Sequence, residues 1–126
     1  MTLFNKYGID TSHCVDFNIE NEAFESQNIT LITDAFTSGK TLRLSLDNIK
    51  SQIGKYPSDI VVCVDRMEQD EHSSLSAKHE IEKQYGVKIH PIVNLDDIVK
   101  AVDNCVISAG DYTEKLKEYR ECYKGL

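Results

Sequence analysis

The residues with the clearest chemical potential lie in the stretch LITDAFTSGKTLR (31–43). Asp34 ends a short apolar run, and the small side chains of Thr37, Ser38 and Gly39 follow three residues later. A phosphate binds where backbone N–H groups are free and bulky side chains are absent, above all at a helix N-terminus. This loop therefore predicts a phosphate site, with Asp34 placed to accept hydrogen bonds from the vicinal hydroxyls of a ribose.

The letters SGKT in this loop invite comparison with the P-loop of nucleoside triphosphatases. That motif, G-x-x-x-x-G-K-[ST], requires glycine at the position held here by Asp34. The nucleoside triphosphatase interpretation is therefore poor.

The elements that must position this loop alternate between strands and helices. Short apolar or β-branched runs bounded by turn residues predict strands at 29–34, 59–65 and 87–93. Between and after these strands, apolar residues recur at helical spacing. In chain order they are Leu42, Leu46, Ile49 and Ile53; Ala77, Ile81 and Tyr85; Leu95, Ile98, Val99 and Val102; and Tyr112, Leu116, Tyr119 and Tyr123.

The ends of these predicted helices carry the residues that favour such ends. Gly54 and Gly86 are expected to stop the first two helices, and Asn94 is the expected N-cap of the third. Asp96 and Asp97 lie in the first turn after Asn94, where the helix dipole favours negative charge, so they are not interpreted as a catalytic pair.

This alternation predicts an α/β fold, a parallel sheet with flanking helices joined by right-handed crossovers. Such sheets bind ligands at the carboxyl ends of their strands. Two segments leave strands at that edge, TDAFTSGKT (33–41) and VDRMEQDEHSS (64–74). Cys63 lies within a predicted strand and is expected to be a small buried side chain.

Charge and composition exclude several classes of protein. The net charge of −7 argues against a nucleic-acid partner, and residues 7–39 hold six carboxylates but no lysine or arginine. No apolar run is long enough to span a membrane, and the N-terminus lacks the features of a signal peptide, so a cytoplasmic location is expected. The four cysteines and four histidines form no set with metal-ligand spacing, so no metal ligand is predicted.

Three stretches together resemble a known family. LITDAFTSGKT (31–41) resembles the phosphoribosyl-diphosphate (PRPP) motif of type I phosphoribosyltransferases, a strand followed by two acids, two apolar residues and T-A/S-G-T. Residues 64–99 resemble orotate phosphoribosyltransferases, with their L-D-R-x-E, L-S-A-x-x-E-[IV]-E and T-L-D-D-L patterns. The tail 112–126 is similar to that family's C-terminal helix with its K-x-Y-R. The resemblance thus covers 29–126 nearly without gaps.

This resemblance implies a partial type I phosphoribosyltransferase (Rossmann-like) fold and an activity in pyrimidine biosynthesis. The reaction would convert orotate and PRPP to orotidine 5′-monophosphate and diphosphate, with Mg²⁺ accompanying PRPP. It also implies that Asp34 contacts the ribose hydroxyls, and that Thr37 and Arg66 contact orotate. Arg66 would pair with the orotate carboxylate, because its planar fork matches a carboxylate. The implied PRPP-binding residues are Asp34, Ala35, Phe36, Thr37, Ser38, Gly39, Lys40 and Thr41. Without the resemblance, an ion pair of Arg66 with Asp65 or Glu68 would be the preferred interpretation.

The sequence departs from the family pattern in three places. Thr33 replaces the first acid of the usual pair, and Lys40 replaces the usual threonine after the glycine, with Thr41 next to it. The family's N-terminal half, with part of the orotate pocket and a basic segment, is not matched. We interpret 1–28 as a divergent segment in place of the mobile catalytic loop, and 29–126 as the phosphoribosyltransferase-like domain.

Three hypotheses follow from these departures. The chain is part of an orotate phosphoribosyltransferase that acts with a missing N-terminal half or as a homodimer; or it is a homologue that binds phosphate or nucleotide without catalysis, as a partner of a complete enzyme. The third hypothesis is a small flavodoxin-like module with unrelated ligands. In the first two, the chain by itself is expected to lack appreciable activity.

Overall fold

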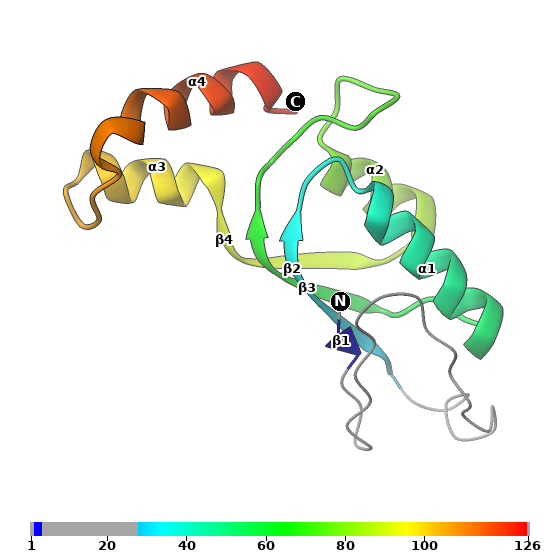
Figure 1. The fold of residues 1–126 in the computed structure, drawn as a ribbon. Helices are drawn as coiled ribbons and strands as arrows, with labels where there is room; N and C mark the ends of the chain where they lie inside the picture. Colours follow the sequence, from blue (N-terminus) through cyan, green and yellow to red (C-terminus); the bar gives the residue numbers. More distant parts are fainter. Residues whose placement is uncertain (1, 4–27, 126) are drawn as a thin grey trace.

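The computed structural model describes residues 2–3 and 28–125, which form a four-stranded sheet with helices beside it (Figure 1). The strands are β1 (Thr2–Leu3), β2 (Thr30–Phe36), β3 (Asp59–Asp65) and β4 (Lys88–Asn94), in the spatial order β1-β2-β3-β4. β2, β3 and β4 are parallel, and β1 pairs antiparallel with β2. The predicted parallel α/β architecture is therefore confirmed.

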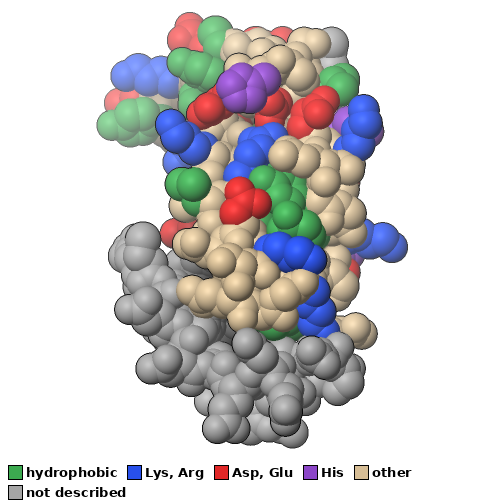
Figure 2. Space-filling view, turned by 90° about the vertical axis from the view of Figure 1, so that its right-hand side faces the viewer, with side chains coloured by type: hydrophobic (Ala, Val, Ile, Leu, Met, Phe, Trp, Pro, Cys, Tyr) green, Lys and Arg blue, Asp and Glu red, His purple; other side chains and the backbone are tan. Residues whose placement is uncertain are grey.

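Helices α1 (Lys40–Ile53) and α2 (Ala77–Tyr85) lie on the same face of the sheet (Figure 1). Each connects a strand to its immediate parallel neighbour, and right-handed crossovers in one direction across a sheet place both helices on one side. Seen from the side of these helices, basic and acidic side chains are interspersed over the surface (Figure 2).

The core lies between these two helices and the sheet. The apolar stripe predicted for the first helix is buried at all four positions, and Gly54 ends α1 in the left-handed conformation. Ala77 and Ile81 of α2 are buried as predicted, and Gly86 ends that helix in the same way. The core residues are Ile29, Leu31, Phe36, Leu42, Leu46, Ile49, Ile53, Ile60, Val62, Ala77, Ile81, Val87 and Ile89.

The C-terminal helices form a pair that extends away from the sheet (Figure 1). They are α3 (Leu95–Asp103) and α4 (Thr113–Tyr123), with a short 3₁₀ turn, Gly110–Tyr112, before α4. Asn94 caps α3 as predicted, since its side chain accepts from the backbone N–H of Asp97 at 2.9 Å.

The apolar stripes predicted for this pair are only partly buried in the described residues. Leu95 is the one buried residue of α3, and α4 has none. Tyr112 and Tyr123 are exposed, at 68% and 54%. The prediction of a packed stripe is therefore wrong for Tyr112 and Tyr123, because α4 extends away from the sheet.

The sheet face opposite α1 and α2 remains open in the part of the chain that the structure describes. Val61 pairs with His90 in the parallel register, and Cys63, His90 and Ile92 are exposed. Successive strand side chains point to opposite faces, so Cys63 shares a face with Val61 and not with the core residue Val62. The expectation that Cys63 is buried is therefore wrong.

The segment 1–28, which we interpret as divergent, lies outside the described residues except for 2–3 and 28. Within the described ranges, none of the helices has the length and apolar content that crossing a membrane requires.

Candidate functional site

The two loops singled out in the sequence lie side by side at one edge of the sheet. β2 and β3 are neighbours, Phe36 is in register with Asp65, and the backbone N–H of Arg66 donates to the carbonyl oxygen of Phe36 at 3.0 Å. Asp34 therefore lies near the end of one strand, and Arg66 directly follows the end of the adjacent strand. A ligand at this edge can reach both loops.

The beginning of α1 offers backbone donors to an anion. Gly39 is the N-cap, no described side chain caps the helix, and its first turn contains no acidic residue. The first three N–H groups of a helix lack partners within the helix, and they carry the positive end of its dipole. Ser38 donates from its hydroxyl to Glu71 at 3.4 Å, while Lys40 and Thr41 are exposed. This geometry is compatible with a bound phosphate.

Gly39 is required by the packing of the protein itself. Its φ of 80° is in the left-handed region, and a Cβ there would overlap Cδ1 of Ile81 and lie 3.1 Å from Nη1 of Arg43. A side chain at position 39 would thus project toward α2 and not toward the exposed edge of the sheet. A larger residue at this position would disturb the fold before it affected a ligand.

Asp34 is exposed and ionised. The backbone N–H of Ala35 donates to its Oδ1 at 2.7 Å and lowers the pKa of the Asp34 carboxyl below its ordinary value. Thr33, which replaces the first of the two acids in the motif that this loop resembles, donates weakly to the same carboxylate oxygen at 3.5 Å. This side of the site therefore presents one carboxylate.

Arg66 is half exposed, and its nearest anionic partner is Glu68. Their side chains are 4.0 Å apart, Nη1 to Oε1, and the exposed part of the Arg66 side chain can meet a ligand. Asp65, the other partner considered, is buried and accepts the backbone N–H of Met67 at 2.8 Å. Burial raises the pKa of the Asp65 carboxyl.

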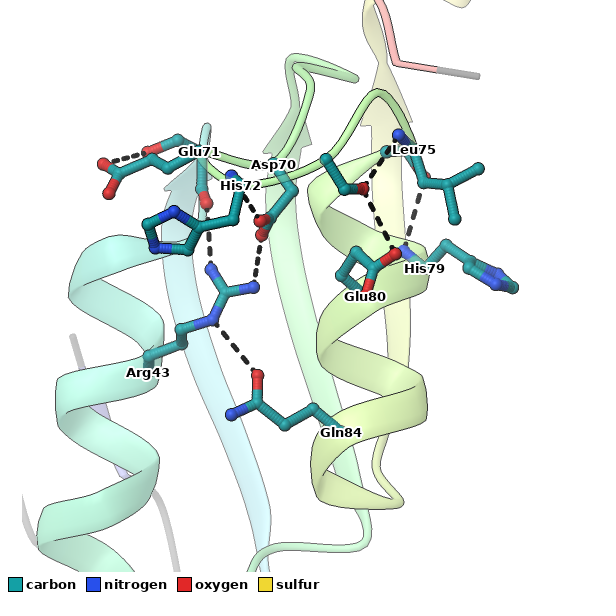
Figure 3. Close-up of polar contacts among 11 residues, drawn as sticks. Arg43, Asp70, Glu71, His72, Leu75, His79, Glu80 and Gln84 are labelled. Atoms are coloured by element: carbon teal, nitrogen blue, oxygen red, sulfur yellow. Dashed lines mark hydrogen bonds and ion pairs between the residues drawn. The ribbon is translucent and has the colours of Figure 1, made fainter.

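Sequence reasoning missed the contact that joins the two loops. Arg43 extends from α1 and donates to the carboxylate of Asp70 and to the carbonyl oxygen of Ser38, the latter at 3.2 Å (Figure 3). Its Nε also donates to Gln84 of α2 at 3.4 Å. In the sequence, Arg43 follows the apolar residue Leu42. Only the angular position of Arg43 around the axis of α1 could have indicated that its side chain points toward α2.

Asp70 is the buried half of this contact. Its side chain is 4% exposed, against 22% for Arg43. Burial acts to raise the pKa of the Asp70 carboxyl, but the backbone N–H of His72 and the Arg43 guanidinium outweigh it and lower that pKa. The loop after β3 is thereby held against the beginning of α1.

A cavity of about 230 Å³ lies beside the same helix. Its lining does not include Asp34, Thr37 or Arg66, so it is not the space between the two strand ends. The lining residues are Lys40, Arg43, Leu44, Asp47, Glu71, His72 and Tyr85. In the described ranges, no three His, Cys, Asp or Glu side chains gather closely enough to hold a metal ion.

Comparison with known proteins identifies relatives that are named orotate phosphoribosyltransferase. The chain is 31% identical over 114 residues to the orotate phosphoribosyltransferase of Metarhizium anisopliae, which aligns 85% of this chain with 47% of that protein. It is 32% identical over 114 residues to the Neurospora crassa protein of the same name, and 33% identical over 95 residues to that of Neisseria meningitidis. No protein-family model matches the chain.

A solved structure agrees with these relatives. The crystal structure of orotate phosphoribosyltransferase from Francisella tularensis matches 76% of this chain and 46% of its own, with a TM-score of 0.58 and 25% identity. The resemblance to orotate phosphoribosyltransferases and the partial type I phosphoribosyltransferase fold are therefore confirmed. The chain spans about half the length of the curated relatives it matches.

Proposed function

We propose that this chain binds the phosphoribosyl group and the orotate carboxylate at the edge where β2 and β3 end. The observation that carries the proposal is the hydrogen bond between Arg66 and Phe36, which brings the Arg66 loop beside the loop 34–41. In this proposal the 5-phosphate accepts hydrogen bonds from the first turn of α1, and Asp34 accepts them from the ribose hydroxyls. Thr37 and Arg66 contact orotate, with the Arg66 guanidinium paired to its carboxylate.

The set of residues proposed for PRPP is the one that the family motif indicates. Ala35 and Phe36 belong to the end of β2, and Phe36 is buried, so these two contribute backbone and packing. Lys40 is exposed at the helix start and is the cation in position to approach a phosphate in the loop. The set is Asp34, Ala35, Phe36, Thr37, Ser38, Gly39, Lys40 and Thr41.

Mg²⁺ would arrive with PRPP, as a counterion of its diphosphate. The residues fit such an ion in part, because Asp34 offers one carboxylate and Thr33 offers none. When bound, the ion would neutralise charge on the leaving diphosphate. Asp34 would hold the ribose in place through its hydroxyls.

For activity we propose that a further polypeptide completes the site. The chain covers less than half of each relative, and the described residues leave one face of the sheet open. Either an N-terminal half like that of the relatives or a second copy of the chain would provide further residues of the site. In both cases 29–126 is the phosphoribosyltransferase-like domain, and 1–28 is a separate segment.

The presence of Thr33 in place of an acid favours a second candidate function. Loss of one acid from the ribose site removes a ligand for the substrate's magnesium but leaves the phosphate loop intact. The chain would then bind phosphate or nucleotide as a non-catalytic partner of a complete enzyme. Turnover after addition of an N-terminal half distinguishes the two functions.

Binding is tested by calorimetry with orotidine 5′-monophosphate. We expect binding by the unaltered chain, weakened about tenfold by Asp34→Asn through loss of hydrogen bonds to a charged acceptor. Asp59→Asn is the matched control, because Asp59 begins β3 at the opposite end of the strand and pairs with His90 at 2.8 Å. Equal weakening by both variants, or no binding by the unaltered chain, would contradict the proposal.

A further inference from the structure

We propose that the segment 119–125 holds Arg66 in the position from which it meets a pyrimidine carboxylate, with Tyr119 and Gly125 as positioning residues. This inference rests on the proposed function, because it presumes that Arg66 pairs with that carboxylate. The end of the chain lies beside the loop that follows β3 (Figure 1).

The backbone of residues 123–125, at the end of this segment, pairs antiparallel with the residues that follow Arg66. The N–H of Gln69 donates to the carbonyl oxygen of Tyr123 at 2.8 Å, and the N–H of Gly125 donates to that of Met67 at 3.0 Å. Glu68 and Lys124 form the antiparallel bridge between these bonds. Two backbone hydrogen bonds thus fix the residues that directly follow Arg66.

The same loop is paired on its other side. Gln69 forms a second antiparallel bridge with Ser76, and the N–H of Ala77 donates to the carbonyl oxygen of Glu68 at 3.0 Å. Residues 67–69 therefore have backbone hydrogen-bond partners on both sides. On one side their partners are at the start of α2, and on the other side they are in the C-terminal segment.

Gly125 is the residue that permits this close approach. A Cβ at Gly125 would lie 2.6 Å from the backbone nitrogen of Ser76 and 3.0 Å from the carbonyl carbon of Leu75. These neighbours are backbone atoms, which cannot rotate away. Any other residue at 125 would push the segment off the loop.

Tyr119 can act on Arg66 because its hydroxyl lies beside both Glu68 and Arg66. Its hydroxyl donates to Oε1 of Glu68, the same oxygen that lies 4.0 Å from Nη1 of Arg66. Glu68 is therefore held by Tyr119 on one side and faces the Arg66 guanidinium on the other. Between them, Met67 has a φ of 60°, which a residue other than glycine keeps only when its surroundings impose it.

Helix α4 carries the segment, and α3 anchors that helix. Asp96, in the first turn of α3, pairs with Arg120 and, at 3.0 Å, with Lys124. Since α3 begins directly after β4, these contacts tie the C-terminal segment to the sheet that carries the site. The position of Arg66 thus depends on residues more than fifty positions later in the chain.

The test compares three ligands by calorimetry in Tyr119→Phe: ribose 5-phosphate, uridine 5′-monophosphate and orotidine 5′-monophosphate. The first has no base, and the second has the base without the carboxylate. We expect about tenfold weaker binding of orotidine 5′-monophosphate and unchanged binding of the other two, because only the carboxylate meets Arg66. Tyr123→Phe, which removes a hydroxyl from the ring packed 4.8 Å from Tyr119, is the matched control. It is expected to leave all three affinities unchanged.

Gly125→Ala supplies a second variant that does not touch Tyr119. It is expected to give the same selective loss, together with faster hydrogen exchange of the Gln69 amide. Equal weakening of all three ligands in Tyr119→Phe would mean a general structural role and would overturn the inference, as would unchanged affinity for orotidine 5′-monophosphate. An unaltered chain that binds none of the three ligands would instead overturn the proposed function, and this inference with it.

Discussion

Arg43 and Asp70 form an ion pair that joins the first turn of α1 to the loop after β3, with the carboxylate more deeply buried than the guanidinium. The pair connects the two loops proposed to form the site, although neither residue belongs to the family motif as matched here. Its removal should therefore affect both the stability of the fold and the geometry of the site.

Replacing Arg43 with methionine should lower the free energy of unfolding by about 2 kcal/mol, because it leaves the Asp70 carboxylate buried without its cation. The double variant Arg43→Met, Asp70→Leu should lose less than the sum of the single changes. Urea unfolding measures both. Arg66→Met, at a half-exposed position, is the control and should change the stability by less than about 0.5 kcal/mol. Additive losses in the double variant would show that the pair is not coupled.

The core beneath α1 should be sensitive at Leu46 and insensitive at Leu44, two residues away on the same helix. Leu46 is fully buried and Leu44 is 63% exposed. Leu46→Ala should cost about 2–5 kcal/mol by cavity formation, and Leu44→Ala less than about 0.5 kcal/mol. Thermal and urea unfolding check both values. Similar costs at the two positions would mean that α1 presents a different face to the sheet.

Replacing Gly39 with alanine should lower the free energy of unfolding more than replacing Gly54, although both glycines have left-handed backbones. Nothing lies within 4 Å of a Cβ at Gly54, whereas a Cβ at Gly39 would overlap Ile81. Gly54→Ala should cost about 1 kcal/mol for its backbone conformation alone, and Gly39→Ala about 1–3 kcal/mol more for overpacking.

Ile81→Val, which removes the overlapping Cδ1, should recover part of the loss in Gly39→Ala. The double-mutant cycle is measured by urea unfolding. Without such recovery, the cost at Gly39 would have to be assigned to the backbone.

Two buried carboxylates should give opposite dependences of stability on pH. The pKa of Asp70 is lowered from its ordinary 3.8, so its contribution is complete above about pH 4 and is lost as the pH falls through the lowered pKa. The pKa of Asp65 is raised, so its ionised form destabilises the fold at neutral pH and protonation relieves this cost as the pH falls.

Asp65→Asn should therefore stabilise the protein at pH 7, because the amide oxygen can still accept the Met67 N–H without a buried charge. As the pH falls from the raised folded-state pKa of Asp65 to its ordinary 3.8, the variant and the unaltered chain should converge. Asp70→Asn should lower stability at pH 7 and flatten the loss in acid. The midpoints of urea unfolding, measured for each variant from pH 7 into the acid range, test these expectations. A destabilised Asp65→Asn at neutral pH would show that the carboxylate is needed in its charged form.

By itself the chain should not turn over orotate and PRPP at an appreciable rate. The ribose site that we propose has one acid, Asp34, and no basic segment is matched that would meet the departing diphosphate. Each interaction that strengthens in the transition state is typically worth ~10²–10³ in rate. Orotate absorbance with magnesium and PRPP measures the rate, with a full-length relative as the control. Turnover near that control and abolished by Asp34→Asn would show that the departures from the motif are compensated.

The sequence alone determined the local structure and the order of the elements. The stripe from Leu42 to Ile53 and the stops at Gly54 and Gly86 depend on neighbours three or four residues away. Strand and helix alternation then determined a parallel sheet, because few topologies satisfy right-handed crossovers. The same local patterns predicted that the loops 33–41 and 64–74 lie at one edge of the sheet, because neighbouring parallel strands end together there.

Tertiary structure decided which of the predicted faces is covered. Cys63 and the tyrosines at 112 and 123 have apolar spacing, but spacing does not say whether another layer packs there. It also decided the contacts between distant segments: Arg43 with Asp70, Glu68 with Tyr119, and Gly125 against Ser76. Each of these joins residues far apart in sequence, and such pairings depend on where the elements are packed rather than on their own propensities.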